Sequence, residues 1–164
     1  MSQRLFDLAF PLAAPFWALM IVAPTWSWTR RIAGSPLIVL PALLVYPVAV
    51  LPVLPELVIE VSRPEFAGLR DLLGTDHGTA GAWAHMIAFD LFVGRWIYLD
   101  SRQRQLHPLI MAPVLVLTIL LAPIGLGAYL AVRAVGSNRR KERPGTDEGA
   151  GREPAVTGRA ASQP

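Results

Sequence analysis

One apolar stretch, residues 79–100, most constrains what this chain can fold into. About 20 helical residues at 1.5 Å each cross a hydrocarbon core of roughly 30 Å. The stretch nevertheless contains His85, Asp90 and Arg95. Steps of five residues spread these side chains around a helix, because each residue turns it by about 100°. A charged group facing lipid costs at least about 2.5 kcal/mol, so we expect protein or water to surround this helix.

Three further apolar runs predict an all-α integral membrane protein with four transmembrane helices. Of the 164 residues, 53% are hydrophobic and 16% are charged, which is unusually apolar for a soluble domain. The first run is too long and too interrupted by proline for a cleaved signal peptide. The predicted transmembrane domain covers residues 1–135, with spans at about 5–26, 36–58, 79–99 and 108–132.

Prolines interrupt these runs, most densely in the second, which contains Pro41, Pro47, Pro52 and Pro55. Each proline inside a helix removes one backbone hydrogen bond and obstructs another. We therefore predict a kinked second span, in which the kinks either shape the bundle or expose carbonyls that line a pocket. After it, apolar residues at helical spacing in 64–73 predict a short interfacial helix.

Residues 136–164 have no apolar periodicity and predict a disordered, basic C-terminal tail. The net charge of +3 does not indicate nucleic-acid binding, because much of the excess lies beside the last apolar run and in the tail. The Ala-, Gly-, Pro- and Arg-rich composition suggests a bacterial cytoplasmic membrane, with the tail in the cytoplasm. Four spans would then place two arginine-bearing loops outside, against the positive-inside rule: Arg30 and Arg31, and Arg102 and Arg104.

The third apolar run carries the candidate chemistry. His85 shares a helix face with Phe89, Phe92 and Trp96, and such an aromatic face would suit a conjugated or isoprenoid ligand. Imidazole is the usual proton-transfer group near neutral pH. The competing interpretation is that these aromatic and polar side chains only pack the bundle.

The sequence does not predict a metal site or a bound cofactor. His85 and Asp90 are five residues apart, so they do not lie on one helix face as two metal ligands would. The chain has no cysteine. It also has no glycine-rich phosphate loop, serine elbow or zinc signature.

A pattern in the third run resembles a known family. The pattern is Trp83, His85, Asp90-Leu91-Phe92, Arg95 and Asp100, with supporting matches at Leu19-Met20, Ala23-Pro24 and Pro123-Ile124-Gly125. The chain from about residue 5 to 134 is similar to the membrane family named after the plant protein abscisic acid deficient four, associated with neoxanthin formation from violaxanthin. The resemblance implies a four-helix membrane protein in or near carotenoid metabolism.

The leading hypothesis is a pocket between kinked helices that binds a carotenoid or another isoprenoid. If the protein is an enzyme, we expect an isomerase acting on a carotenoid epoxide, because that reaction needs proton movement and no redox cofactor. His85 would transfer the proton, Asp90 would assist it, and Arg95 would stabilise negative charge. The predicted ligand-binding residues are Trp83, Phe89, Phe92, Trp96 and Asp100.

Two other functions stay open. The first is a non-catalytic scaffold or assembly protein for another membrane enzyme, in which Asp90 and Arg95 stabilise the bundle. The second is a small transporter, which the absence of a repeat between the two halves disfavours. The expected partners are the lipid bilayer, an isoprenoid ligand, and either another membrane protein or a second copy of the chain.

Overall fold

The computed structural model describes residues 1–141, with side chains through residue 135. In this range the chain is entirely helical and has no strand, which confirms the all-α prediction. The elements are α1 (Ser2–Val22), α2 (Ser27–Gly34), η1 (Pro36–Val39), α3 (Leu40–Leu43), α4 (Val45–Val50), η2 (Leu51–Val53), α5 (Leu54–Ser62), α6 (Phe66–Leu73), α7 (Asp76–Gln103), α8 (Pro108–Leu120) and α9 (Ala122–Lys141).

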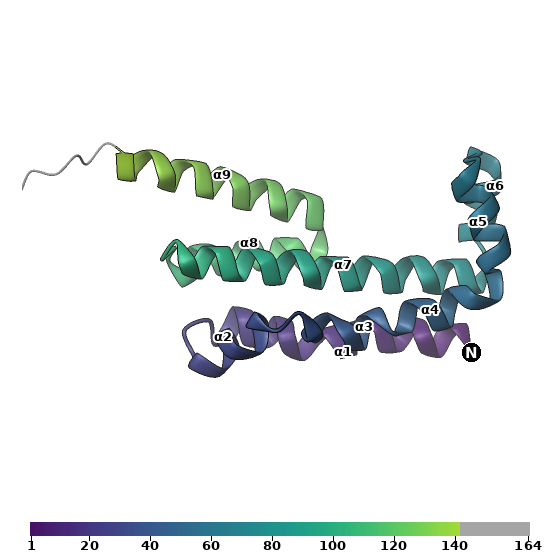
Figure 1. Cartoon of the computed structure of the whole chain (residues 1–164), viewed down its shortest axis with the longest axis horizontal. Helices are drawn as coiled ribbons and strands as arrows, with labels where there is room; N and C mark the ends of the chain where they lie inside the picture. Colours follow the sequence, from purple (N-terminus) through teal and green to yellow (C-terminus); the bar gives the residue numbers. More distant parts are fainter. Residues whose placement is uncertain (142–164) are drawn as a thin grey trace, which may run out of the picture.

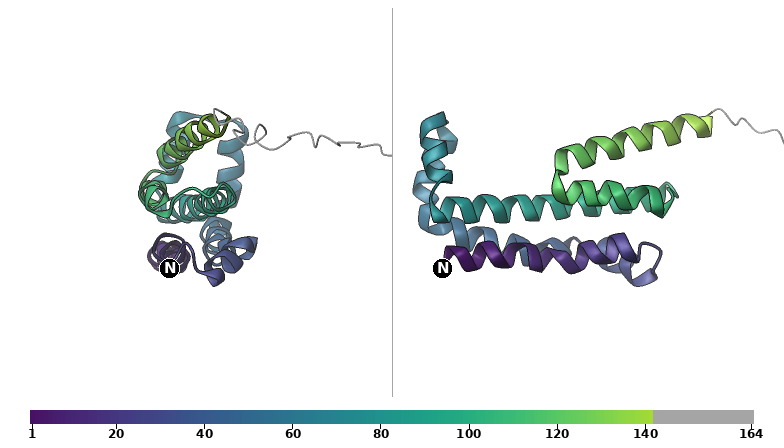
Figure 2. Two further views of the ribbon diagram at one scale, coloured as in Figure 1. Left: turned by 90° about the vertical axis from the view of Figure 1, so that its left-hand side faces the viewer. Right: turned by 180° about the vertical axis from the view of Figure 1, so that it is seen from behind.

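Helix α7 is the centre of the molecule. It runs in the same direction as α1, whereas α3 and α4 run the opposite way beside α1 (Figure 1). Seen along the helices, α1 and α3–α4 form one layer, α7 and α8 form the next, and α9 lies outermost (Figure 2). Helices α5 and α6 stand across the end of the bundle that holds the N-terminus (Figure 1).

Small residues bring α1 and α7 close together. Ala9 and Ala13 on α1 and Ala84 and Ala88 on α7 are at most 2% exposed and belong to one core cluster. Small side chains let helix backbones approach, which is the usual way that helices pack in membranes. Further along α7, Gly94 lies directly against the Trp17 ring of α1.

The enclosure that we predicted for α7 is incomplete. Helices α8 and α9 cover only its second half (Figure 2). On the first half, His85 is exposed, and Met86 and Phe89 are 47% and 55% exposed. Phe92, just past the midpoint, is 51% exposed. One face of α7 is therefore open to the surroundings of the protein.

The proline-rich second segment is broken as the sequence predicted. Between Pro36 and Ser62 the chain alternates 3-10 and α-helical pieces, and each 3-10 piece carries a proline near its start. Ser2–Val22 and Pro36–Ser62 are both long and apolar enough to cross a membrane. Within the apolar 18-residue stretch of each segment, only 22% and 28% of the residues are buried inside the molecule. Four spans are not confirmed.

The predicted fourth span, 108–132, is not a single helix. Helix α8 has 13 residues, about 20 Å, which is shorter than a hydrocarbon core of roughly 30 Å. The break is at Leu121 (φ −151°, ψ 75°), and nearby Pro123 has no N–H for a continuous helix. A Cβ on Gly125 would lie 2.5 Å from the Thr118 Cα, so glycine lets α9 fold back against α8.

The C-terminal boundary also differs from the sequence prediction. Helix α9 continues to Lys141, past the predicted start of the tail at residue 136. Because of the fold-back, its C-terminal end lies at the same end of the bundle as α2 and the α7–α8 turn (Figure 1). The rest of the predicted disordered tail, 142–164, lies outside the described residues.

Candidate functional site

An apolar pocket of about 490 Å³ lies where the kinked second segment diverges from α7. We call it the His85 pocket. Its lining is Tyr46, Val50, Val53, Leu57, Leu69, Leu72, Leu73, Gly78, Gly81, Ala82, His85 and Met86. Tyr46 and His85 are the two lining residues with a polar side-chain group. An apolar cavity of this size with few polar groups is typical of a small-molecule site.

The corner between α6 and α7 shapes one wall of this pocket. The Thr75 hydroxyl accepts a hydrogen bond from the Gly78 N–H at 3.0 Å and so caps α7. A Cβ on Gly78 would lie only 2.0 Å from the Leu72 carbonyl oxygen. Glycine at this position therefore allows the tight corner that turns the leucines of α6 toward α4 and α7.

His85 is both exposed and oriented by aromatic neighbours. Its ring stacks on Phe89 with centroids 4.6 Å apart and an interplanar angle of 25°. The Tyr46 ring lies 5.5 Å away on α4, tilted by 55°. The imidazole is therefore positioned at the pocket wall by ring contacts and remains accessible to a ligand.

The structure does not bring Asp90 and Arg95 to His85. Arg95 donates hydrogen bonds to the Gly34 carbonyl at 2.9 Å and the Ser35 carbonyl at 3.3 Å. These carbonyls end α2, where the helix dipole is negative. Asp90 makes no hydrogen bond or ion pair within the described part of the chain. His85 and Arg95 are about 15 Å apart along the helix axis, so the three predicted catalytic residues form no single cluster.

The predicted ligand-binding residues also separate. Phe89 lies beside His85, as the helical spacing predicted. Trp83 faces the other way and stacks on Phe6 of α1 at 5.1 Å. Phe92 is on the open face of α7. Only Phe89 among these three contacts the His85 ring.

Trp96 and Asp100 belong to a separate polar cluster with α9. The Trp96 ring meets the Tyr129 ring edge-on at 5.5 Å. The Asp100 carboxylate accepts hydrogen bonds from the Tyr129 hydroxyl and from Arg104 Nε at 2.7 Å, and Arg133 lies 3.7 Å away. Burial raises the pKa of Asp100, but these hydrogen bonds and cations outweigh it and hold the pKa below its ordinary value. This cluster ties α7 to α9 and lies away from the His85 pocket.

Sequence reasoning missed Tyr46 and Tyr129. Each is a tyrosine within an apolar run. A buried tyrosine hydroxyl usually has a polar partner, so these positions carried a signal that a polar contact or site was near. The sequence contained no comparable signal for the part of the pocket wall that α6 forms.

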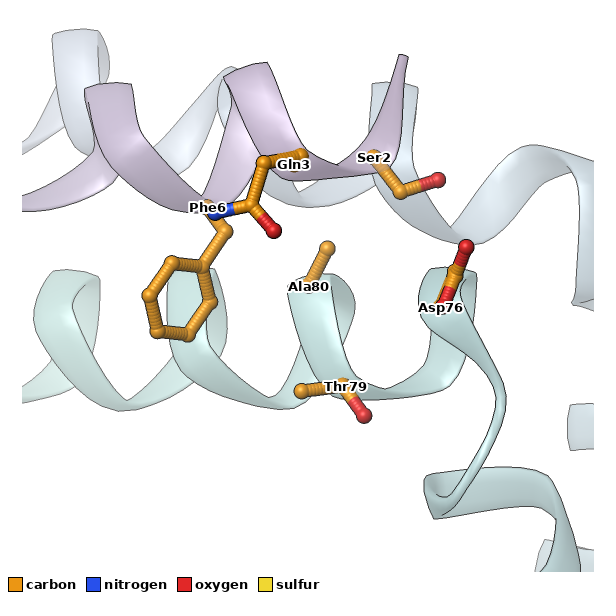
Figure 3. A pocket seen from close by; sticks show the side chains of 6 residues that line it. All are labelled: Ser2, Gln3, Phe6, Asp76, Thr79 and Ala80. Atoms are coloured by element: carbon orange, nitrogen blue, oxygen red, sulfur yellow. The ribbon is translucent and has the colours of Figure 1, made fainter.

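A smaller pocket of about 230 Å³ lies between the starts of α1 and α7. Figure 3 shows Ser2, Gln3 and Phe6 on α1 facing Asp76, Thr79 and Ala80 on α7. Just beside it, His77 Nδ1 lies 3.3 Å from Ser2 Oγ and 3.2 Å from the Ala49 carbonyl oxygen, so His77 links three helices. Among the described residues there is no group of three or more His, Cys, Asp or Glu able to hold a metal ion.

Comparison with known proteins gives one family and one curated relative. The family described as ABA DEFICIENT 4-like matches residues 4–129. The chain is 26% identical over 147 residues to "Protein ABA DEFICIENT 4, chloroplastic" of Arabidopsis thaliana. This match covers 85% of the chain and 65% of the relative, so the chain spans slightly less than two thirds of the relative's length. No solved structure matches.

Proposed function

The chain belongs to the ABA DEFICIENT 4-like family, and from this membership and the His85 pocket we propose that it is an integral membrane protein that binds a carotenoid or another oxygenated isoprenoid. The observation that carries the proposal is an apolar cavity of about 490 Å³ whose polar side chains are Tyr46 and His85. The family resemblance supplies the ligand class, and the pocket supplies a place for it.

The placement in a membrane is supported by where the apolar surface lies. In a soluble protein, a long apolar helix would be mostly buried in the core. In this protein most residues of the two apolar stretches, in Ser2–Val22 and Pro36–Ser62, are not buried. Large exposed apolar surfaces mark contact with a membrane or a partner. We propose the bacterial cytoplasmic membrane as the location, with the lipid bilayer as the first partner.

The chemistry of the lining matches one end of an oxygenated carotenoid. Such a ligand is a conjugated chain with a ring at each end, and its ring oxygens need few polar contacts. The Tyr46 hydroxyl and the His85 imidazole would meet a ring oxygen, and the leucine and valine side chains would enclose the ring. The conjugated chain would lie along the open face of α7, over Phe89 and Phe92, both about half exposed.

Isomerisation of a carotenoid epoxide is the reaction that these groups could carry out. Protonated His85 would give its proton to the epoxide oxygen as a C–O bond breaks, with the Tyr46 hydroxyl hydrogen-bonded to that oxygen. The neutral imidazole would then remove a proton from a neighbouring carbon, whose electrons form the new double bond. The product has the composition of the substrate, and His85 regains its proton. Arg95 has no part in this step, because it binds the carbonyls of α2.

Three variants would test the proposal in detergent-purified protein at matched folded amounts, by mass spectrometry of the bound lipids. Leu69→Trp fills the pocket from α6 and should abolish carotenoid recovery. Phe66→Trp is its control on the same helix, since Phe66 is 86% exposed and does not line the pocket. His85→Phe keeps the ring contacts, so it should retain the ligand and lose turnover of an added carotenoid epoxide.

Bulk lipid alone in the wild type and all variants would refute the ligand-binding proposal. A bound carotenoid that every variant turns over equally would refute the role of His85. The first outcome would favour the scaffold function, with another membrane protein or a second copy as partner. The contacts of Arg95 with α2 and of Asp100 with Tyr129 and Arg133 of α9 agree with that alternative, because there the polar residues of α7 stabilise the bundle.

A further inference from the structure

A third pocket, which is polar, lies at the opposite end of the bundle from α5 and α6. It has a volume of about 440 Å³ and lies between the α1–α2 turn and the α7–α8 turn. Its lining is Pro24, Thr25, Arg30, Arg102, Gln105, Leu106, His107 and Pro108. The lining includes two arginines and no carboxylate, so the pocket attracts anions.

The guanidinium groups of Arg30 and Arg102 both have N–H donors that lack an acceptor in the described part of the chain. Arg30 is exposed and has no carboxylate partner in the described range. Arg102 donates from Nη2 to the Leu106 carbonyl oxygen, but its Nε is buried and has no acceptor among the described residues. A buried donor without an acceptor is costly, and more so on a charged group. An oxygen-rich anion in the pocket would accept hydrogen bonds from the exposed Arg30 guanidinium and from the Arg102 guanidinium, which also lines the pocket.

The surroundings of the pocket are those of a membrane–water interface. Trp26 and Trp28, beside Arg30, are 52% and 54% exposed, and exposed tryptophans collect at the headgroup level of membranes. On the other side, Leu109 and Ile110 follow the pocket on α8 and are 77% and 52% exposed. Aliphatic surface next to a cationic pocket suits a ligand with an anionic head and apolar tails.

The charge distribution of the whole molecule agrees with this setting. The pocket end holds Arg30, Arg31, Arg102, Arg104 and Arg133 together with Asp100, because the fold-back of α9 brings Arg133 within 3.7 Å of Asp100. The opposite end holds Glu56, Glu60, Glu65, Asp71 and Asp76, with Arg4, Arg63 and Arg70. By the positive-inside rule the pocket end faces the cytoplasm. The cytoplasmic leaflet is also where anionic lipids give the membrane a negative surface potential.

We propose that this pocket binds the phosphate of an anionic phospholipid headgroup between Arg30 and Arg102, with the acyl chains along the start of α8. A free phosphate shares the chemistry of the head, but it would make no use of the exposed Leu109 and Ile110. The site is separate from the His85 pocket, so this proposal does not depend on the proposed carotenoid binding.

The test uses delipidated full-length protein in detergent, titrated with phosphatidylglycerol and followed by native mass spectrometry. Phosphatidylcholine and inorganic phosphate are the comparison ligands. Arg30→Gln and Arg102→Gln remove the two charges that line the pocket. Arg31→Gln removes the same charge one residue away, where Arg31 lies over the Trp28 ring and does not line the pocket.

We expect one phosphatidylglycerol to bind more tightly than phosphatidylcholine. Binding should weaken by about fivefold for each pocket arginine removed and should stay unchanged in Arg31→Gln. Equal losses in Arg30→Gln and Arg31→Gln would overturn the proposal, because they would indicate general surface charge. Competition by inorganic phosphate as strong as by the lipid would overturn the lipid assignment. Arg30→Gln keeps the test valid if Arg102→Gln does not fold, since Arg30 is exposed.

Discussion

Replacing Gly94 by alanine tests the close contact between Gly94 of α7 and Trp17 of α1. An added Cβ would lie 2.1 Å from Trp17 Cη2 and 2.4 Å from Trp17 Cζ3, whereas carbon atoms normally approach to about 3.5 Å or more. Trp17 is 3% exposed in the core, so its ring has little room to move. The helices must separate or the indole must change its rotamer.

The expected magnitude follows from two opposing effects. Overpacking a filled core costs about 1 to 3 kcal/mol, and the rigid neighbour in this case favours the upper part of that range. Alanine gains up to about 1 kcal/mol over glycine as a helix former. We therefore expect Gly94→Ala to lower the free energy of unfolding by about 1 to 2 kcal/mol.

Gly127→Ala is a matched control within the same protein. Gly127 lies in α9, and a Cβ there would meet nothing within 4 Å. This variant should show only the gain in helix propensity. Thermal unfolding of both variants in the same detergent, followed by circular dichroism, gives the packing cost as their difference. Trp17→Leu in the Gly94→Ala background should recover part of the loss, because leucine lacks the outer ring atoms.

Equal stability of the two alanine variants would refute this reasoning. It would mean that α1 and α7 are farther apart than the contact between Gly94 and Trp17 implies.

Three further predictions concern the end of the bundle that holds the Arg30–Arg102 pocket and the orientation of the protein in the membrane. Gln105 lies one residue beyond the C-cap of α7 and has a left-handed φ of 56°, so Gln105→Gly should raise the stability by up to about 1 kcal/mol in thermal unfolding. The lowered pKa of Asp100 stabilises the fold above its ordinary pKa of 3.8, and this stabilisation should disappear as the pH falls through the lower folded-state pKa; acid titration of Asp100→Asn should lack this component. On intact cells, a membrane-impermeant maleimide should label Ser62→Cys and not Ser27→Cys. The reverse labelling pattern would mean that the protein has the opposite orientation in the membrane. The native chain has no cysteine, so it contributes no labelling of its own.

Local sequence patterns predicted the helices well where one short-range rule decides the structure. The prolines between Pro41 and Pro55 predicted a broken segment, since each proline disrupts the helix at its own position. The spacing of apolar residues in 64–73 predicted a short helix, and α6 is at Phe66–Leu73. The stacking of His85 on Phe89 also follows from local spacing, because residues four apart are neighbours on a helix.

The fourth apolar run shows where local patterns were insufficient. Its length predicted one span, but the turn at Leu121 depends on α9 packing against α8, where Gly125 meets Thr118. That contact joins two helices and cannot be seen in hydropathy. Its consequence is global, since the fold-back brings Arg133 within 3.7 Å of Asp100, at the end of α7 where Arg102 shares a pocket with Arg30. The arginines of the two loops and of α9 then lie at one end, which removes the conflict in the positive-inside count.

The helical class, the family and the chemistry of the third apolar run could be predicted from the sequence, because these depend on composition, spacing and short motifs. The tertiary structure decided which residues of other helices they meet. It placed Tyr46 beside His85 and gave Arg95 to the end of α2. Such contacts join residues tens of positions apart, and their formation depends on how whole helices pack, which no single helical pattern contains.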